Sequence, residues 1–465
     1  MDILLSHGYF LSEDPHELKI MKPYPPLGLL YISSYLKSKG FQTQIFDSTF
    51  NTLRAYQEYI QTMRPPVVGL YSNLMTRQHI LQMIKVSKEA GSLVILGGPD
   101  PANYAMEYLA YGADIIVTGE GELTLEELLP RLPGQNISKL QDIKGIAFLE
   151  NDSLVQTLPR PAITDLDSLP YPDRDGIDIN QYIQTWKDNH GMGSISLITA
   201  RGCPYTCTWC SHAVFGYSHR RRSVENVADE LELMIGKYHP DMVWYADDVF
   251  TINHRWLFEY ASALKKRHIH IPFETISRED RLNKQVIQTL AEMGCYRLWI
   301  GSESGSQRVL DAMQRKTDAA RAREMTHLLQ DHGIEAGLFI MLGYDGEEIE
   351  DIEESVQFLK EANPKTFLTT VAYPIKGTPY YEAVADRIIP LKTWDSGSDR
   401  DFTIAGRHSR RFYHFATQWM VNEVAFEKQK KAARKNYLHI GKTKFNSWAG
   451  RLGMRFTQHE IENGQ

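Results

Sequence analysis

Three of the chain's 4 cysteines stand close together, and their spacing is typical of an iron–sulfur site. Cys203, Cys207 and Cys210 follow one another at C-x3-C-x2-C spacing between Arg201 and Ser211. Three thiolates on a short loop can bind three irons of a [4Fe–4S] cluster, and the fourth iron then stays open to another ligand. The spacing therefore predicts a cluster that can bind and activate a small molecule.

Zinc and disulfides are the competing interpretations of these cysteines. A structural zinc site needs four protein ligands, and His212 follows Cys210 too closely to complete a tetrahedral site comfortably. Disulfide frameworks are typical of small secreted chains, whereas this chain has 465 residues and 4 cysteines. The remaining Cys295 is expected to be a small buried hydrophobic residue, so no second cysteine-bound cluster is expected.

The cysteine run resembles the cluster loop of radical S-adenosylmethionine (SAM) enzymes. In that family an aromatic residue precedes the third cysteine, as Trp209 precedes Cys210 here. The resemblance implies that the open iron binds the amino and carboxylate groups of SAM. It also implies that an electron from the cluster cleaves SAM to a 5′-deoxyadenosyl radical, and that Trp209 contacts the adenine.

The elements that must position this loop follow a strand–helix repeat, which predicts a partial (β/α)6 TIM-type barrel with its site at the carboxyl ends of the strands. The first expected strand leads directly into the cysteine run. Expected strands cover 195–199, 242–245, 271–275, 297–300, 335–341 and 367–371, with helices such as 224–238 and 307–313 between them.

Polar residues follow several of these strands. The resemblance implies that Asp247 and Asp248 bind the SAM amino group, that Arg278 pairs with its carboxylate, that Glu303 contacts its ribose or amino-acid part, and that Gly343 lies near adenine. Carboxylates suit the sulfonium and ammonium charges of SAM, and a guanidinium suits its carboxylate. The two aspartates could instead cap a helix, and Gly343 could serve packing alone.

The first part of the chain has another strand–helix alternation, which predicts a doubly wound, Rossmann-like parallel sheet. Turn segments at 71–75, 96–100 and 118–124 fall where strands end, and ligands bind over such ends in open α/β sheets. The alternation is carried by strand or helix patterns at 2–5, 27–39, 44–46, 67–72, 80–89, 93–96, 115–117 and 123–129.

These turns, with the run 25–31, resemble the cobalamin-binding domain that precedes the radical SAM domain in a large subfamily. The resemblance implies that the cofactor pocket is lined by Ser72, Gly97, Gly98, Gly119 and Glu120.

Two acidic residues and a histidine in this part of the chain can also be interpreted without cobalamin. Glu120 and Glu122 could instead stabilise the helix that starts near Leu123, because carboxylates suit a helix N-terminus. His16 lies in Asp14-Pro-His16, but Lys19 replaces the glycine of the cobalt-ligating motif, so this match is attributed to chance.

The composition shifts predict four regions: a cobalamin-binding domain over 1–150, a linker over 151–190, the radical SAM barrel over 191–390, and a small basic helical region over 391–465. Proline- and glycine-rich breaks define the linker. Residues 407–455 carry twelve Lys/Arg against Glu423 and Glu427. This basic region could face an anionic substrate, an acidic electron donor or a membrane surface, or could be a solvated helical face.

The chain has a formal net charge of −7, 42% hydrophobic residues and no apolar run long enough to span a bilayer. It begins without the basic and apolar stretch of a secretory signal. We therefore expect a cytoplasmic enzyme with no transmembrane segment and no nucleic-acid partner.

The resemblance favours a cobalamin-dependent radical SAM methyltransferase that methylates an unactivated carbon of a small molecule, using the 5′-deoxyadenosyl radical and methylcobalamin. The cofactors implied are a [4Fe–4S] cluster, SAM and cobalamin, with a flavodoxin or ferredoxin as electron donor. One alternative is oxidation without methyl transfer, as in the anaerobic magnesium-protoporphyrin monomethyl ester cyclase. A cobalamin- or redox-sensing protein is the alternative outside enzymes, but it would leave Asp247, Arg278 and Glu303 without a role.

Overall fold

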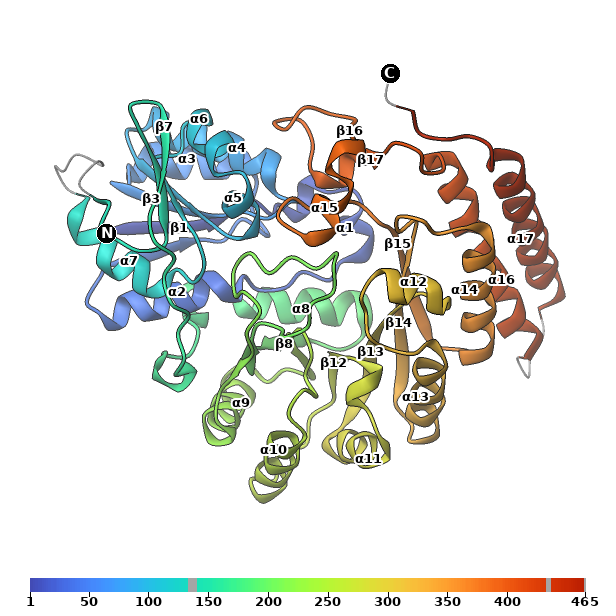
Figure 1. Cartoon of the computed structure of the whole chain (residues 1–465). Helices are drawn as coiled ribbons and strands as arrows, with labels where there is room; N and C mark the ends of the chain where they lie inside the picture. The colour runs from blue at the N-terminus through green and yellow to red at the C-terminus, as the bar shows by residue number, and fades with distance from the viewer. Residues whose placement is uncertain (133–139, 432–435, 464–465) are drawn as a thin grey trace. The chain divides into compact units, whose positions relative to one another are not determined.

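The computed structural model describes residues 1–132, 140–431 and 436–463 (Figure 1). The chain divides into two compact units, which are described separately. The first unit contains Met1–Pro204, Ser211–Trp244 and Lys392–Ser398. The second unit contains Tyr205–Cys210, Tyr245–Leu391 and Asp399–Gln465.

The first unit is built on a seven-stranded sheet with the order β2-β1-β3-β4-β5-β6-β7. Strands β1 to β5 pair in parallel, and β6 and β7 add antiparallel pairs at one edge. The order reverses between β1 and β3, which is the topological switch point of a doubly wound sheet. The bounds are β1 Ile3–His7, β2 Thr43–Phe46, β3 Val67–Tyr71, β4 Leu93–Gly97, β5 Ile115–Val117, β6 Ile146–Glu150 and β7 Ser153–Gln156.

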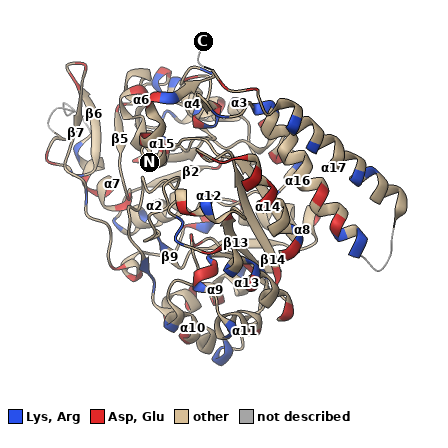
Figure 2. Ribbon diagram, turned by 45° about the vertical axis from the view of Figure 1, so that its right-hand side comes forward, with Lys and Arg blue, Asp and Glu red and all other residues tan. Residues whose placement is uncertain are grey.

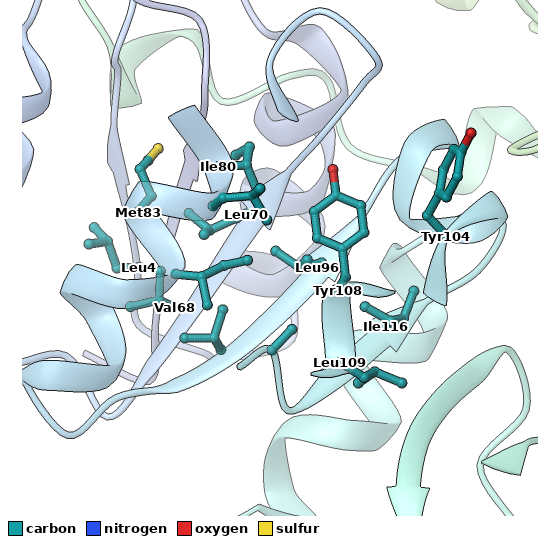
Figure 3. Close-up of a cluster of buried hydrophobic side chains, with 14 of the residues drawn as sticks. Leu4, Val68, Leu70, Ile80, Met83, Leu96, Tyr104, Tyr108, Leu109 and Ile116 are labelled. Atoms are coloured by element: carbon teal, nitrogen blue, oxygen red, sulfur yellow. The ribbon is translucent and has the colours of Figure 1, made fainter. Parts of the chain in front are cut away.

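Alternation along the strands produces two apolar layers, because successive side chains of a strand point to opposite faces. Leu4 and Val68 lie in one layer, which Figure 3 shows with Tyr108. Ile3 and Val67 lie in the other layer. The helices around the sheet are α2 Leu27–Ser38, α3 Leu53–Met63, α4 Arg77–Glu89, α5 Pro99–Asn103, α6 Ala105–Tyr111 and α7 Glu122–Leu128. The predicted Rossmann-like architecture is confirmed.

A helix lies where the sequence analysis expected only a linker. Helix α8, Ile179–His190, begins at Asp178, whose side chain accepts a hydrogen bond from the backbone N–H of Gln181, and ends at Gly191 in the left-handed conformation. It buries Ile179, Tyr182, Ile183 and Trp186, the spacing of an amphipathic helix. The proline-rich breaks just before it, over 158–176, obscured this pattern.

Several short elements complete the part of the first unit that leads to the cysteine run. Strand β8, Ser194–Leu197, is a neighbour of β11, Met242–Tyr245. The short strands β9, Ala200–Arg201, and β10, Arg220–Arg221, pair in antiparallel fashion. Helix α9, Val224–Tyr238, has the bounds predicted from the sequence.

The second unit contains four parallel strands that pair in sequence order: β12 Phe273–Ser277, β13 Cys295–Glu303, β14 Glu335–Leu342 and β15 Thr366–Val371. Helices separate them, as the predicted barrel repeat requires. These are α11 Lys284–Met293, α12 Gln307–Ala312, α13 Ala319–Asp331 and α14 Ile349–Ala362, and α10 His254–Lys266 precedes β12.

The predicted helical C-terminal region is also confirmed. After α15, Pro379–Val384, the strands β16, Ile388–Pro390, and β17, Phe402–Ile404, form a small hairpin. Two long helices follow, α16 Arg410–Lys431 and α17 Tyr437–Thr457. Helix α16 packs against α14 and against α17 (Figure 1). Within the described ranges, the helices are all too short or too polar to cross a bilayer.

Candidate functional site

The cysteine loop is anchored in the second unit through its middle residues. The backbone N–H and the hydroxyl of Thr208 both donate to the carbonyl of Met313, at 3.3 and 3.1 Å. The carbonyl of Thr208 accepts from the backbone N–H of Tyr380 at 2.9 Å. Cys207 is buried, Cys203 is half-buried and Cys210 is exposed. The loop therefore has a fixed centre beside Cys207.

Two buried guanidinium groups point at the sulfur of Cys207. Nη1 of Arg278 lies 3.7 Å from Sγ, and Nη1 of Arg315 lies 3.8 Å from it. Burial raises the pKa of the Cys207 thiol, and the charge of Arg278 opposes that rise. The two cations favour the thiolate, which is the form that binds iron, and hydrogen bonds to a ligating sulfur tune the metal it holds.

The fit to a [4Fe–4S] cluster rests on the thiolates and arginines around Cys207, and not on a set of ligands that already surrounds a metal position. Among the residues that the structure describes, no three His, Cys, Asp or Glu side chains are grouped closely enough to hold a metal ion. The donor set is nonetheless of the right kind, because thiolates are the ligands of such clusters and the two arginines would offset their charge. The three-cysteine ligand set stays a prediction.

Two carboxyl groups lie beside these arginines with few partners. Glu303 ends β13 with a left-handed backbone, φ 59°, which is uncommon for a residue with a side chain. Burial raises the pKa of Glu303 to about 8, Glu279 adds to the rise, and Arg278 opposes it. Within the described part of the chain, no hydrogen bond or ion pair reaches the Glu303 carboxylate.

Glu279 is completely buried, and burial raises its pKa to about 7. Its Oε2 lies 3.5 Å from Nη2 of Arg315, whereas its Oε1 has no hydrogen-bond partner among the described residues. A buried carboxyl group with a perturbed pKa is a candidate for ligand binding. Together, Glu279 and Glu303 would gain from a positively charged ligand.

The structure thus groups Cys207, Arg278 and Glu303, three residues that the sequence analysis chose, and adds two that it missed. Glu279 directly follows Arg278 in the sequence, but no motif distinguishes it. Arg315 lies between two residues with left-handed backbones, Gln314 and Lys316, and no sequence pattern indicates its role.

The other residues expected to bind SAM differ in how deeply they are buried and in what they contact. Asp247 is buried and Asp248 is exposed. Trp209 packs against an apolar cluster that includes Tyr344 and Tyr380, with Met341 of β14 beside it. The end of β14 and the aromatic residue of the cysteine loop therefore share one apolar environment.

Gly343 has a packing role that is visible in the structure. It has a φ of 73°, and a Cβ atom added there would lie 2.9 Å from Cζ of Tyr413 in α16. Its backbone N–H donates to the carboxylate of Glu347. Burial raises the pKa of Glu347 to about 8, and the hydrogen bond from Gly343 opposes the rise.

In the first unit, a small residue follows the carboxyl end of each of four parallel strands. These residues are Gly8 after β1, Ser72 after β3, Gly98 after β4 and Gly119 after β5. Ligands of doubly wound sheets bind over these ends, at the switch point between β1 and β3. Small side chains at these positions let a ligand approach the backbone closely, which suits a cofactor such as cobalamin.

Ser72 and Gly98 also serve the packing of their own loops. Ser72 is completely buried, its Oγ lies 3.0 Å from the hydroxyl of Tyr108, and its backbone N–H donates to the carbonyl of Gly97 at 2.9 Å. Gly98 has a φ of 110°, and an added Cβ would lie 2.3 Å from the carbonyl oxygen of Ser72. Only glycine fits at that position.

Glu120 and Glu122 are engaged in a buried ion-pair network. Arg201 donates to Oε1 of Glu120 at 2.7 Å and to Oε1 of Glu122 at 2.6 Å. Oε2 of Glu120 accepts from Arg220 at 2.7 Å and from the backbone N–H of Ile163 at 2.8 Å. Neither carboxylate caps α7 through its side chain. The network ties the loop after β5 to the strand just before the cysteine run.

His16 is set apart from this machinery by its exposure. Its side chain is 80% exposed, and its Nδ1 lies 3.6 Å from Oε1 of Glu17. These surroundings agree with attributing its motif match to chance.

Two family models match the chain, in the order that the architecture predicts. The B12 binding domain matches residues 18–129, and the radical SAM superfamily matches residues 197–359. Both matches fall on the regions that carry the candidate residues described above.

Two relatives whose names give different activities match most of this chain. An uncharacterized methyltransferase of Pyrococcus horikoshii is 27% identical over 379 residues, covering 80% of this chain and 81% of the relative. The anaerobic magnesium-protoporphyrin IX monomethyl ester cyclase of Cereibacter sphaeroides is 25% identical over 80% of this chain and 62% of the relative.

A solved structure shares the fold. It is the radical SAM methyltransferase TsrM from Kitasatospora setae with cobalamin and a [4Fe–4S] cluster bound. It matches with a TM-score of 0.69 and 17% identity, covering 84% of this chain and 76% of TsrM.

Proposed function

Because the chain is a cobalamin-dependent radical SAM enzyme, we propose that it methylates an unactivated carbon of a small-molecule substrate. It uses a [4Fe–4S] cluster, SAM and cobalamin. The observation that carries the proposal is the buried group around Cys207, in which two arginines face the sulfur and two carboxyl groups lack full partners. When bound, the cofactors supply a carbon-centred radical and a methyl group.

We assign Cys203, Cys207 and Cys210 as the cluster ligands. Arg278 and Arg315 act as positioning residues, because their N–H groups reach the sulfur of Cys207 and their charges favour its thiolate. Nε of Arg278 is itself held at 2.9 Å by Oδ1 of Asp280, which fixes the direction of the guanidinium.

We assign SAM to carboxyl groups of the second unit. Glu303, Asp247 and Asp248 would face its positive groups, and Arg278 would also face its carboxylate. Burial makes Glu303 a strong partner for a cation, since an opposite charge in a site of low dielectric interacts more strongly than in water. Trp209 and Gly343 would then line the adenine, and the apolar cluster around Trp209 supports this.

We assign cobalamin to the carboxyl ends of the first-unit strands, with Ser72, Gly97, Gly98 and Gly119 lining the pocket. The row of small residues at the switch point supports this assignment. Glu120 belongs to the same turn, but both its oxygens accept hydrogen bonds from arginines, so we infer that it shapes the pocket through Arg201 and Arg220.

We propose the domain boundaries expected from the sequence, with cobalamin bound by 1–150, a linker at 151–190 that includes β7 and α8, SAM and the cluster bound by 191–390, and a basic helical region at 391–465. We place the enzyme in the cytoplasm, because cluster-binding thiolates need a reducing compartment. A flavodoxin or ferredoxin would supply electrons, and the substrate could be anionic. We propose no nucleic-acid partner.

The second candidate function is oxidation or cyclisation without methyl transfer. The observation that favours it is the 25% identity to the anaerobic cyclase of Cereibacter sphaeroides, although this chain covers only 62% of that relative. A sensor without enzymatic activity is not proposed, because it would leave the carboxyl and guanidinium groups around Cys207 without a task.

One experiment separates the two enzymatic functions. The protein is reconstituted without oxygen with iron, sulfide and hydroxocobalamin, and then receives reductant and SAM with a deuterated methyl group. Mass spectrometry should detect 5′-deoxyadenosine, S-adenosylhomocysteine and cobalamin that carries the labelled methyl. Formation of 5′-deoxyadenosine with bound cobalamin that never acquires the label would overturn the methyltransferase proposal in favour of oxidation.

A further inference from the structure

Helix α17 exposes large apolar side chains that a packed helix normally buries. These side chains are largely exposed to solvent at the surface of the second unit. The exposed fractions are 75% for Tyr437, 90% for Leu438, 64% for Phe445, 58% for Trp448 and 80% for Phe456. Large contiguous apolar patches of this kind are rare on soluble monomers and mark interaction sites.

The opposite side of α17 packs through small residues. Its buried positions are Thr443, Ser447, Gly450, Met454 and Thr457. A Cβ atom added at Gly450 would lie 2.7 Å from the backbone nitrogen of Trp419, and one added at Gly453 would lie 2.5 Å from Cδ1 of Phe415. Close contact with α16 therefore depends on small residues, and the large apolar residues are not needed to hold α17 in place.

The exposed residues form one stripe along the helix. With about 100° of turn per residue, positions 438, 445 and 456 lie within about 20° of one another, and 448 lies about 80° to one side. Position 447 lies about 180° from position 438, on the buried side. An amphipathic surface helix normally turns its apolar face toward the core. In helix α17 the face with the large apolar side chains is exposed instead.

Positive charge accompanies the stripe. Helix α17 contains Lys442, Lys444, Arg451 and Arg455 and no Asp or Glu (Figure 2). Three of these residues pair with acidic residues of the neighbouring helices: Glu423 lies 3.2 Å from Lys444, and Glu353 lies 2.7 Å from Arg451 and 3.7 Å from Arg455. The side chains of these three cations are still 47–58% exposed. Arg434 and Lys435, which precede the helix in the sequence, lie outside the described residues.

We propose that α17 docks on the surface of an anionic lipid bilayer. An apolar stripe with aromatic residues, bordered by Lys and Arg, is the pattern of helices that lie in the membrane interface. Tyr and Trp suit this depth because one end of the ring is apolar and the other polar. Lysine and arginine side chains reach the lipid phosphates, and each adds attraction to a negative surface.

Charge argues against a second copy of the chain as the occupant. Two α17 helices placed face to face would bring four positive residues against four, and Glu423 and Glu353 of the neighbouring helices would offset only part of that charge. A negatively charged surface has the complementary charge. The inference does not depend on the proposed methyl transfer, because it concerns where the enzyme works and not what it catalyses.

The test is co-sedimentation of the full chain with two kinds of vesicle, one of phosphatidylcholine and one that also contains an equal share of phosphatidylglycerol. The protein should bind the anionic vesicles at least about tenfold more tightly, and added salt should weaken the binding. The double variant Phe445→Ser/Trp448→Ser should lose at least about tenfold in affinity, and Lys442→Glu should lose a smaller part.

The matched control removes two exposed apolar residues elsewhere, Leu158→Ser/Met63→Ser, which are 72% and 44% exposed, and should bind like the wild type. Circular dichroism confirms that each variant is folded. Absence of binding to anionic vesicles would overturn the proposal, as would equal binding by the stripe variant. Dimerisation that the stripe variant abolishes, without vesicle binding, would instead assign the stripe to self-association.

Discussion

Two groups of buried carboxylates, one in each unit, differ in how their charge is balanced. In the first unit, Glu120 and Glu122 accept hydrogen bonds from Arg201, and Arg220 completes the network. In the second unit, and among the described residues, one oxygen of Glu279 has no hydrogen-bond partner and Glu303 accepts no hydrogen bond. The nearby arginines of the second unit both face the sulfur of Cys207, and Arg315 also reaches Oε2 of Glu279 at 3.5 Å.

The difference separates a structural role from a binding role. Buried charges with full partners hold a loop in place, and removing one partner leaves an uncompensated charge. Buried carboxyl groups without full partners take up protons at neutral pH, and they are the groups that a cationic ligand would stabilise most. The first network therefore has a structural role, and the second group is the one that we propose to bind SAM.

The largest expected effect is on stability, and it comes from breaking the first network. Arg201→Met leaves Glu120 and Glu122 buried with one cation fewer, so the free energy of unfolding should fall by about 3–5 kcal/mol. Urea denaturation measures it. Arg54→Met is the control, because Arg54 pairs with Glu58 at the surface and its side chain is 86% exposed. A loss below about 1 kcal/mol for Arg201→Met, as for a surface pair, would contradict the structural role.

A smaller loss of stability is expected when the group of Glu279 and Glu303 is disturbed, and this loss should depend on pH. Arg315→Met removes the cation beside Glu279, whose pKa burial already raises to about 7. Glu279 can respond by keeping its proton, so the loss of stability should be about 1–3 kcal/mol at pH 8 and smaller at pH 6. Urea denaturation at both pH values measures it, with Arg315→Lys as the conservative control. A loss as large as that of Arg201→Met at both pH values would remove the contrast.

The smallest effect concerns a third buried carboxyl group, Glu347, whose pKa is raised to about 8. An unfolded glutamate releases its proton near pH 4.3, so between that value and about 8 the folded state binds more protons. Stability should therefore be greatest at low pH within this window and fall as the pH rises. Glu347→Gln should reduce the fall by about 1 kcal/mol between pH 5 and pH 6, measured by thermal unfolding of the cofactor-free protein. An unchanged slope would show that Glu347 does not titrate in this way.

The sequence predicted the strands and the cysteine loop because their signals are local. The apolar runs of β3 and β11 and the spacing of Cys203, Cys207 and Cys210 can be read within a dozen residues. Arg315 could not be found this way, since it lies 108 residues from Cys207 and only the fold brings the two together. No local pattern indicates such a pairing.

The pairing of charged side chains could not be predicted from local sequence either. Glu120 and Glu122 were expected beside cobalamin or at a helix end, and their pairing with Arg201, about 80 residues further on, depends on the packing of the first unit. The basic region over 407–455 was recognised, but its sequence could not decide which side of α17 faces outward. Gly450 and Gly453 settle this, because only the fold reveals how closely α16 approaches them.

The most direct test of the contrast is SAM binding to the cluster-loaded protein, measured by equilibrium dialysis for the wild type, Glu303→Gln and Glu120→Gln. Glu303→Gln should weaken SAM binding by at least about tenfold, equivalent to about 1.4 kcal/mol, because it removes a carboxyl group that the positive charge of SAM would ionise. Glu120→Gln should stay within about twofold of the wild type once folded protein is counted. Equal binding by Glu303→Gln and the wild type, with a loss confined to Glu120→Gln, would contradict the assignment of SAM to the second unit's carboxyl groups.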